Sequence, residues 1–206
     1  MKYSVVMAAF LGEYKGCASN RENKFIRAVN SFLEQEYKDK ELIIISDFCD
    51  ITERLYNEYF KEYDNIFFKK LKKKMSHFSG AVRNAGISLS TGDRICYLDT
   101  DDFLGKGHLT KIHEQFDDGL VWTYSDDYLV SEFNSFGDFK RIVRVNEIRE
   151  TRIGTSSICH SSKISSNWPD GYGHDWHFIK SLLNYKHKKI NNTSYNVRHI
   201  PSQFDV

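Results

Sequence analysis

Short apolar runs alternate with amphipathic segments through the first half of the chain. Residues 3–9 and 41–46 are mostly apolar, which predicts strands that are buried on both faces. Between them, the apolar residues of 24–35 recur at intervals of three and four, which places them on one face of a helix. Further strands are predicted at 65–69 and 94–98, and further helices at 51–59 and 81–89. This alternation predicts an α/β fold, a mainly parallel sheet with helices on both faces.

The second half of the chain has a less regular pattern. It predicts strands at 120–124, around 142–145 and at 195–200, and a helix that begins near His174. No internal repeat and no Gly-, Pro- or Ser-rich linker divides the chain. A length of 206 residues suits one domain. We therefore expect a single domain.

Parallel sheets bind ligands beyond the carboxyl ends of their strands, and this rule indicates three places in the chain. These places are residues 8–10, Asp47 and the acidic segment with Asp99, Asp101 and Asp102. Carboxylates so close together repel one another unless a cation or hydrogen bonds compensate. Oxygen ligands without a nearby thiolate suit Mg²⁺ or Mn²⁺. The alternative is a turn in which an aspartate caps the next helix.

The segment HFSGAVRNAGISLSTGDRICYLDTDD, residues 77–102, resembles the core of the family 2 glycosyltransferases of the GT-A fold. The residues in step with the family pattern are Arg83, Asn84, Gly86, Gly92, Leu98, Asp99, Asp101 and Asp102. Residues 25–50 are similar to the family's first helix and second strand, and GYGHDWHFIKSL, residues 171–182, to its later acidic segment. The resemblance implies a GT-A-like domain in which residues 1–102 bind the nucleotide sugar and 103–206 supply the acceptor and catalytic half.

For the nucleoside, the resemblance implies a pocket at the end of the first strand. Ala8, Ala9 and Phe10 would line this pocket. Asp47 would accept a hydrogen bond from the base, typically from uracil N3–H. The implied donor is therefore a nucleotide-diphosphate sugar, UDP-linked.

For the diphosphate, the resemblance implies Arg83, whose permanent charge and bidentate geometry suit phosphate. Asp99, Thr100 and Asp101 would form the DxD motif, in which Asp99 and Thr100 touch the nucleotide sugar. Asp99 and Asp101 would bind Mn²⁺ or Mg²⁺, and His199 would complete the metal sphere. An ordinary solvated side chain is an equally open interpretation of His199.

For the reaction, the resemblance implies Asp175 as the general base of an inverting transfer to the hydroxyl of a glycan or another acceptor. Asp102, His174 and Trp176 are candidates for acceptor contacts or for supporting positions. His174 and Trp176 are equally typical of helix packing.

The chain departs from the family pattern in four places. Ala8 stands where the family has proline, and SDFCD, residues 46–50, replaces a glycine-containing loop. Residues 11–23 form a polar insertion, which we expect to be a lid over the donor or acceptor. His174 stands where the family has glutamate.

Charge and composition restrict the partners. The 29 Lys and Arg nearly balance the 28 Asp and Glu, leaving a net charge of +1, which argues against a polybasic nucleic-acid binder. The lysine run 68–74 is interpreted as a solvated edge, or else as a contact for a phosphate-bearing acceptor such as anionic lipid or DNA. Asp126 and Asp127 are predicted to close a turn, with contacts to acceptor hydroxyls as the alternative.

The cysteines and the apolar runs bear on localisation. The four cysteines are scattered and show no metal-binding spacing, which favours a reducing, cytoplasmic setting. No apolar run reaches the length of a membrane-spanning helix. We expect a cytoplasmic protein that can be peripheral at a membrane surface.

Three alternatives remain open. A sugar-phosphate nucleotidyltransferase would need a compact Gly-rich phosphate loop and a catalytic lysine, a pattern that MAAFLGEYKG lacks. A glycosyltransferase acting on a modified nucleic-acid base would use the lysine run. A non-catalytic nucleotide-sugar or nucleic-acid binding module would have a decayed site, and the presence of Arg83, Asp99, Asp101 and Asp175 argues against it.

Overall fold

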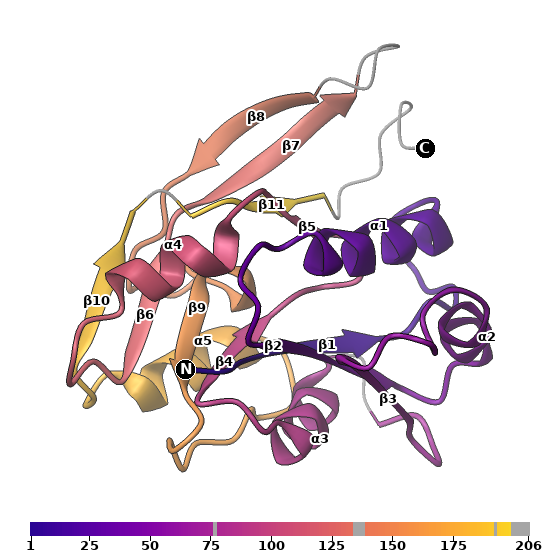
Figure 1. The fold of residues 1–206 in the computed structure, drawn as a ribbon, viewed down its shortest axis with the longest axis horizontal. Coiled ribbons are helices and arrows are strands. Elements are labelled where there is room, and N and C mark those ends of the chain that lie inside the picture. The colour runs from indigo at the N-terminus through magenta and orange to yellow at the C-terminus, as the bar shows by residue number, and fades with distance from the viewer. Residues whose placement is uncertain (76–77, 134–138, 192, 199–206) are drawn as a thin grey trace.

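The computed structural model of the chain describes residues 1–75, 78–133, 139–191 and 193–198. A seven-stranded sheet runs through the molecule in the order β10-β6-β9-β4-β1-β2-β3 (Figure 1). Its strands, in chain order, are β1 (Tyr3–Ala9), β2 (Lys40–Ser46), β3 (Ile66–Lys70), β4 (Arg94–Tyr97), β6 (Trp122–Ser125), β9 (Ile158–Ser161) and β10 (His187–Ile190).

The sheet is mainly parallel, as the alternating pattern predicts. β3, β2, β1 and β4 are mutually parallel neighbours. β9 is the exception, because it runs antiparallel between β4 and β6. The carboxyl ends of β1, β2 and β4 therefore meet at one edge.

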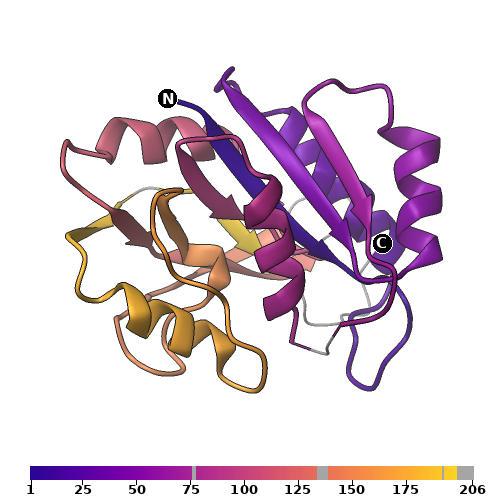
Figure 2. The same ribbon diagram turned by 90° about the horizontal axis from the view of Figure 1, so that it is seen from below.

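Helices cover both faces of the sheet. They are α1 (Arg21–Leu33), α2 (Asp50–Tyr59), α3 (Gly80–Leu89), α4 (His108–Gln115) and α5 (His174–Leu182). Figure 1 shows α1 and α4 on one side, and Figure 2 shows α3 and α5 on the other. None of the helices in the described ranges has the length and apolar composition to cross a membrane.

Two apolar cores follow from the alternation of side chains along the central strands. Val5 and Met7 of β1 pack with Phe25 and Phe32 of α1. Val6, between them in the sequence, faces the opposite way into the core under α3 and α5. One strand thus supplies both layers, which is why its sequence is apolar without interruption. The prediction of a single α/β domain with helices on both faces is confirmed.

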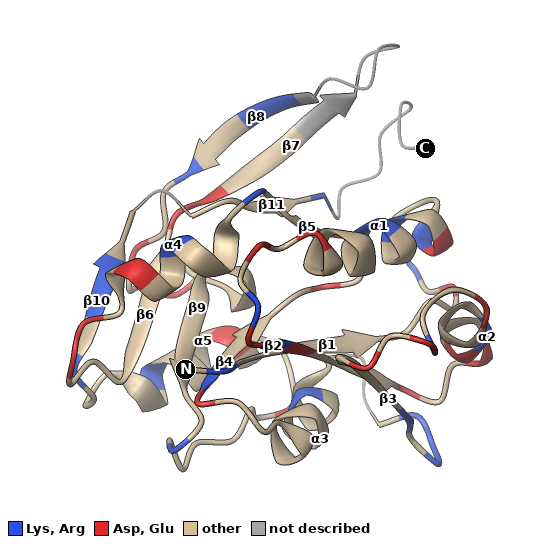
Figure 3. Cartoon of the chain, in the orientation of Figure 1, with Lys and Arg blue, Asp and Glu red and all other residues tan. Residues whose placement is uncertain are grey.

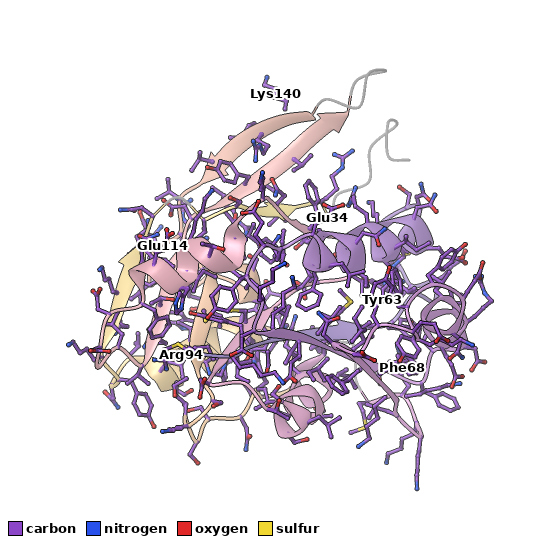
Figure 4. All side chains as sticks on the ribbon, in the orientation of Figure 1. Glu34, Tyr63, Phe68, Arg94, Glu114 and Lys140 are labelled. Atoms are coloured by element: carbon purple, nitrogen blue, oxygen red, sulfur yellow. The ribbon has the colours of Figure 1, made fainter. Side chains whose placement is uncertain are left out.

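A second, four-stranded sheet lies beside α1 and α4, in the order β5-β11-β7-β8. Its strands are β5 (Phe103–Leu104), β7 (Asp127–Phe133), β8 (Phe139–Arg144) and β11 (Tyr195–Val197). β7 and β8 form a hairpin, and Figure 4 shows Lys140 at its outer side, directed away from the rest of the molecule.

The prediction of a turn at Asp126 and Asp127 is wrong. Asp127 is the first residue of β7 and is fully buried, where it accepts hydrogen bonds from Arg144. Asp126 accepts the backbone N–H of Asn146 at 2.8 Å. Both carboxylates are bonded to the segment around β8, which sequence spacing alone does not reveal.

α3 packs unusually close to β1 at Gly86. A Cβ atom added to this glycine would lie 2.5 Å from Cγ1 of Val6, well inside van der Waals contact. The residue is therefore glycine because of the helix–sheet distance and not because of a turn.

We expect Gly86→Ala to lower the free energy of unfolding by about 1–3 kcal/mol through overpacking. At an unconstrained interior helix position the same change stabilises by about 1 kcal/mol, so the sign is diagnostic. Urea unfolding of the wild type, Gly86→Ala, Val6→Ala and the double variant measures the coupling. Removal of the Val6 methyl groups should reduce the cost of Gly86→Ala. Equal or greater stability of Gly86→Ala would contradict the close approach.

Candidate active site

A cavity of about 520 Å³ opens where β1, β2 and β4 end. The residues that line it are Ala8, Phe10, Tyr14, Lys15, Arg21, Asp47, Lys74, Ser79, Arg83, Asp99, Thr100 and Asp101. Six of the residues predicted to bind the nucleotide sugar line this cavity: Ala8, Phe10, Asp47, Arg83, Asp99 and Thr100. The cavity thus lies where the topological rule for parallel sheets predicts a ligand site.

The end of β1 alternates between the cavity and the core. Ala8 and Phe10 line the cavity, whereas Ala9 is 1% exposed and belongs to the core. The carbonyl oxygen of Ala9 accepts the backbone N–H of Asp47 at 2.8 Å. Ala9 therefore ties β1 to the loop after β2 and does not face the cavity.

Asp47 is buried and lines the cavity directly after the end of β2. Its Oδ1 accepts the backbone N–H of Met75 at 2.7 Å, and its Oδ2 lies 3.8 Å from Nζ of Lys74. The same Nζ sits 3.0 Å from the centre of the Phe10 ring. One lysine thus contacts both groups at the end where β1 and β2 stop.

The lysine run does not form a uniform solvated edge. Lys70 binds the carboxylates of Asp50 and Glu53, while Lys74 lines the cavity. After β3 the chain returns toward the end of β2, where the N–H of Met75 donates to Oδ1 of Asp47. The run follows a strand of the parallel sheet, so the rule about strand ends could have singled out Lys74.

The loop after Asp47 makes its turn without the family's glycine. Phe48 adopts a left-handed backbone with φ of 55°, which non-glycine residues rarely occupy. Ser46 supports the turn, since its hydroxyl donates to the Cys49 carbonyl at 3.0 Å and accepts the Cys49 N–H at 3.1 Å. Side-chain hydrogen bonds therefore hold a conformation that glycine would adopt freely.

The insertion at 11–23 reaches the cavity wall. Tyr14 and Lys15 line the cavity. Arg21 donates hydrogen bonds to the carbonyl oxygens of Phe10 and Gly12, and its guanidinium lies 4.9 Å from the centre of the Tyr14 ring. The insertion is thereby anchored to the end of β1.

Arg83 is the central cation of the site and only 6% exposed. Its Nη2 donates to Oδ1 of Asp99 at 3.1 Å, and its Nη1 lies 2.9 Å from Nε2 of His174. The guanidinium also lies over the ring of Trp168, 4.8 Å from the ring centre. Arg83 thus joins α3, the acidic loop after β4 and the first turn of α5.

Trp168 is a supporting residue that the sequence pattern did not reveal. Asn84, next to Arg83, binds it in both directions: its Nδ2 donates to the Trp168 carbonyl and its Oδ1 accepts the Trp168 N–H, both at 2.8 Å. The indole also donates to the hydroxyl of Tyr97 at 2.9 Å. Asn84 therefore holds the wall against which Arg83 stacks.

Asp175 lies at the start of α5 with its side chain 35% exposed. Its Oδ1 accepts from the Thr155 hydroxyl at 2.7 Å and lies 3.0 Å from Nε2 of His174. Burial alone would raise the pKa of Asp175. The His174 hydrogen bond, the nearby Arg83 guanidinium and the Thr155 hydroxyl outweigh burial and lower this pKa below its ordinary value. Asp175 is therefore a carboxylate at neutral pH.

The acidic loop after β4 divides into two roles. Asp99, Thr100 and Asp101 line the cavity. Asp102 is 3% exposed and accepts the backbone N–H of Arg198 at 2.6 Å and the hydroxyl of Tyr195. Burial, followed by the charges of Asp101 and Asp99, raises the pKa of Asp102 well above its usual range. Asp102 therefore anchors β11.

Trp176 does not line the cavity; it is half-buried and packs against the core under α3 and α5. His199 lies outside the described residues, so its role as a metal ligand stays a prediction.

Asp99 and Asp101 suit a divalent cation. Mg²⁺ typically takes one or two carboxylates and completes its sphere with substrate phosphates and water, and both side chains line the cavity. Within the described ranges, no three His, Cys, Asp or Glu side chains are arranged to hold a metal ion. The protein ligands therefore fit an ion that is bound together with an anionic ligand.

The family of the chain follows from its sequence profile. The family described as "Glycosyl transferase family 2" matches residues 17–182. The chain belongs to this family. The match includes α1, the acidic loop after β4 and the start of α5, and hence most of the site.

Individual relatives extend the comparison of this family 2 glycosyltransferase. The poly(ribitol-phosphate) beta-N-acetylglucosaminyltransferase TarP of Staphylococcus aureus (strain N315) is 32% identical over 114 residues, which cover 54% of this chain and 32% of TarP. The chain thus spans about a third of TarP.

Two solved structures share the fold. S. aureus TarS 1-349 in complex with UDP-GlcNAc has a TM-score of 0.73 at 16% identity, over 98% of this chain and 59% of that one. The mannosyltransferase PcManGT from Pyrobaculum calidifontis, in complex with GDP-Man and Mn2+, has a TM-score of 0.67 at 10% identity, over 99% of this chain and 58% of that one. These similarities show the GT-A architecture.

We expect Thr155→Val to raise the pKa of Asp175, because the variant removes a hydrogen bond that favours the charged carboxylate. Carbon-13 NMR titration of the aspartate carboxyl groups measures this change. The lowered pKa of Asp175 also stabilises the folded state. This stabilisation is fully present above the unfolded-state pKa of about 3.9 and is lost as the pH falls through the folded-state pKa.

Ser157→Ala is the matched control. Its hydroxyl donates to the carbonyl oxygen of Gly154 at 2.8 Å and makes no described contact with Asp175. An Asp175 pKa that moves equally in both variants, or in neither, would mean that the Thr155 hydrogen bond does not stabilise the carboxylate.

Proposed function

We propose that this chain catalyses a metal-dependent, inverting transfer of a sugar from a nucleotide-diphosphate sugar to a hydroxyl of a glycan. The supporting observation is one connected arrangement. Asp47, Arg83, Asp99 and Asp101 surround a single cavity, and His174 connects Arg83 to Asp175 outside it. Family membership supports the same reaction class.

The nucleoside would occupy the end of the cavity at Phe10 and Asp47. Asp47 would accept the N3–H of uracil, and the Lys74 ammonium would donate to a neighbouring carbonyl oxygen of the base. This acceptor–donor pair suits uracil and disfavours cytosine and adenine, which lack that N–H. The UDP-GlcNAc complex of TarS supports a UDP-linked donor. A guanine donor is the second candidate, because PcManGT was solved with GDP-Man.

The diphosphate would lie between Arg83 and the carboxylates of Asp99 and Asp101. A bound Mn²⁺ or Mg²⁺, for which His199 is a further candidate ligand, would neutralise negative charge on the departing diphosphate. Arg83 would supply a fixed, permanently charged hydrogen-bond donor to the same group. Thr100 would contribute to the wall beside the sugar.

Asp175 would act as the general base. Its lowered pKa keeps it ionised at neutral pH, so it can take the proton of the acceptor hydroxyl as the new bond to the anomeric carbon forms. The nucleoside diphosphate leaves from the opposite side, which inverts the stereochemistry. His174 and Thr155 would hold the carboxylate in position.

The division of labour along the chain supports two halves. Every residue that lines the cavity at the ends of β1, β2 and β4 precedes residue 102, whereas Asp175 and the Thr155 that binds it follow it. We propose that 1–102 bind the donor and 103–206 bind the acceptor. Asp102 and Trp176 would support the acceptor half by packing, not by touching the acceptor.

We further propose a cytoplasmic location. The four cysteines are free thiols. Cys96 and Cys159 lie directly opposite each other on β4 and β9, both buried, without forming a disulfide. Adjacent reduced thiols of this kind are typical of a reducing compartment.

Calorimetric titration with UDP, with and without Mn²⁺, tests the donor half. We expect metal-dependent binding that weakens by at least about tenfold in Asp101→Asn, the loss of roughly one strong charged contact. Asp117→Asn is the matched control, since this exposed aspartate pairs with Lys188 away from the cavity. Equal UDP affinity in wild type and Asp101→Asn would overturn the metal site, and GDP binding in place of UDP would change the donor.

Asp175→Asn tests the catalytic half. We expect the affinity for UDP to change by less than about twofold while release of UDP from the bound UDP-sugar slows by roughly 10²-fold or more, as for loss of a general base. Release of UDP is measured by a coupled assay. Near-normal turnover would place the base elsewhere, and loss of UDP binding would mean that Asp175 belongs to the donor site.

A further inference from the structure

Another, smaller cavity lies beside the proposed base. It measures about 270 Å³ and shares no lining residue with the cavity at the ends of β1, β2 and β4. Asp175 forms part of its wall, together with Gly154, Asn146, Arg144 and Arg152. Asp175 is the only acidic side chain among the residues that line it. A molecule in this cavity would therefore meet the base and two guanidinium groups.

Arg144 is a cation held in a fixed orientation. Its Nε and Nη2 donate to the two oxygens of Asp127 at 2.8 and 2.6 Å, and Nη2 also lies 3.2 Å from the Ser156 hydroxyl. Asp127 is fully buried and further accepts from Asn146 at 3.1 Å. In the described part of the chain Nη1 of Arg144 has no partner, so one edge of a rigid guanidinium remains available.

Arg152 supplies the second guanidinium and is exposed. The described residues offer it no carboxylate partner. Its backbone closes the loop, because its carbonyl oxygen accepts the N–H of Glu147 at 3.1 Å and its N–H donates to the Arg149 carbonyl at 3.1 Å. The side-chain carboxylate of Glu147 instead pairs with Arg149, with Oε2 3.9 Å from Nη2. The charge of Arg152 is therefore uncompensated beside the cavity.

The surroundings strengthen the positive character of this region. Figure 3 shows basic residues along β8, which leads into the cavity wall and carries Lys140, Arg141 and Arg144. An anion would meet favourable charge on approach and fork-like donors at the wall. The anion itself could not lie against Asp175, since like charges repel. The anionic group of such a ligand therefore has to be a different group from the one that faces Asp175.

We propose that the acceptor is anionic: a polyol or glycan whose phosphate or carboxylate binds Arg144 and Arg152 while its hydroxyl faces Asp175. This inference rests on the proposed function and specifies the acceptor class for the same site. Guanidinium groups bind both anions bidentately, so the experiment has to distinguish phosphate from carboxylate.

The test compares three small probes that share a three-carbon 1,2-diol and differ in charge: glycerol 3-phosphate, glycerate and glycerol. NMR titration measures their affinities for the full chain, with and without UDP and Mn²⁺. We expect one or both anions to bind at least about fivefold more tightly than glycerol, the gain of one charge-assisted hydrogen bond. The stronger of the two identifies the anion.

Variants locate the binding. Arg152→Gln should weaken the anionic probe by about fivefold or more and leave glycerol unchanged. Arg149→Gln is the matched control, three residues away in the same loop and outside the cavity. Arg144→Lys keeps a cation for the buried Asp127 but removes the fork, so it should weaken the probe without unfolding the protein.

The outcomes separate this inference from the proposed function. Anion preference that Arg152→Gln removes and Arg149→Gln retains supports the anionic acceptor. Equal affinity for the three probes overturns it even when UDP binds. So does an equal loss of anion affinity in Arg152→Gln and Arg149→Gln. Absence of UDP binding would contradict the proposed donor, while the titration without UDP would still decide whether the cavity holds an anion.

Discussion

A buried guanidinium cannot be left without partners, and Arg83 carries such a group where α3, the end of β4 and α5 meet. Removing a charge from water costs several kcal/mol unless opposite charge and hydrogen bonds compensate. Asp99, His174 and the face of Trp168 together do so. These three partners come from different parts of the chain: the loop after β4, α5 and the segment before it. Compensation of one charge therefore fixes how α3, β4 and α5 meet.

The same reasoning explains the second sheet. Asp102 is buried with its carboxylate bonded to β11 and the residue that follows it, and the hydroxyl of Tyr195 also accepts the N–H of Asp99 at 3.0 Å. The acidic loop thus has one side that faces the cavity and one side that faces the fold. An acidic side chain of this loop can thus stabilise the fold instead of lining the cavity.

The first half of the chain could be predicted from its sequence because its information is local. β1 and β2 are apolar runs and α1 carries an apolar stripe at helical spacing, and the strand-end rule indicated Asp47 and the acidic loop. β9 could not be predicted, because it is a four-residue strand whose antiparallel place between β4 and β6 depends on distant partners. α4 was missed because eight residues hold too short a stripe.

Site residues divide in the same way. Asp99 and Arg83 follow from motif positions, and whether Asp175 acts as the base remains a prediction. Lys74 reaches the cavity because the segment after β3 returns to Asp47, and Trp168 lies beneath Arg83 because Asn84 holds it there. Such contacts depend on tertiary structure, which no local pattern encodes.

His174 has a consequence that concerns protons. Its Nε2 lies within hydrogen-bond distance of a donor, Arg83, and of an acceptor, Asp175, and one nitrogen can satisfy only one of them at a time. Its Nδ1 is buried without a partner among the described residues, so neither tautomer is favoured from that side. With Nε2 bare, the ring accepts from Arg83; with Nε2 protonated, it donates to Asp175. The contacts of Nε2 with Arg83 and with Asp175 are therefore mutually exclusive in the neutral ring, and the position of a single hydrogen atom decides which of them is a hydrogen bond.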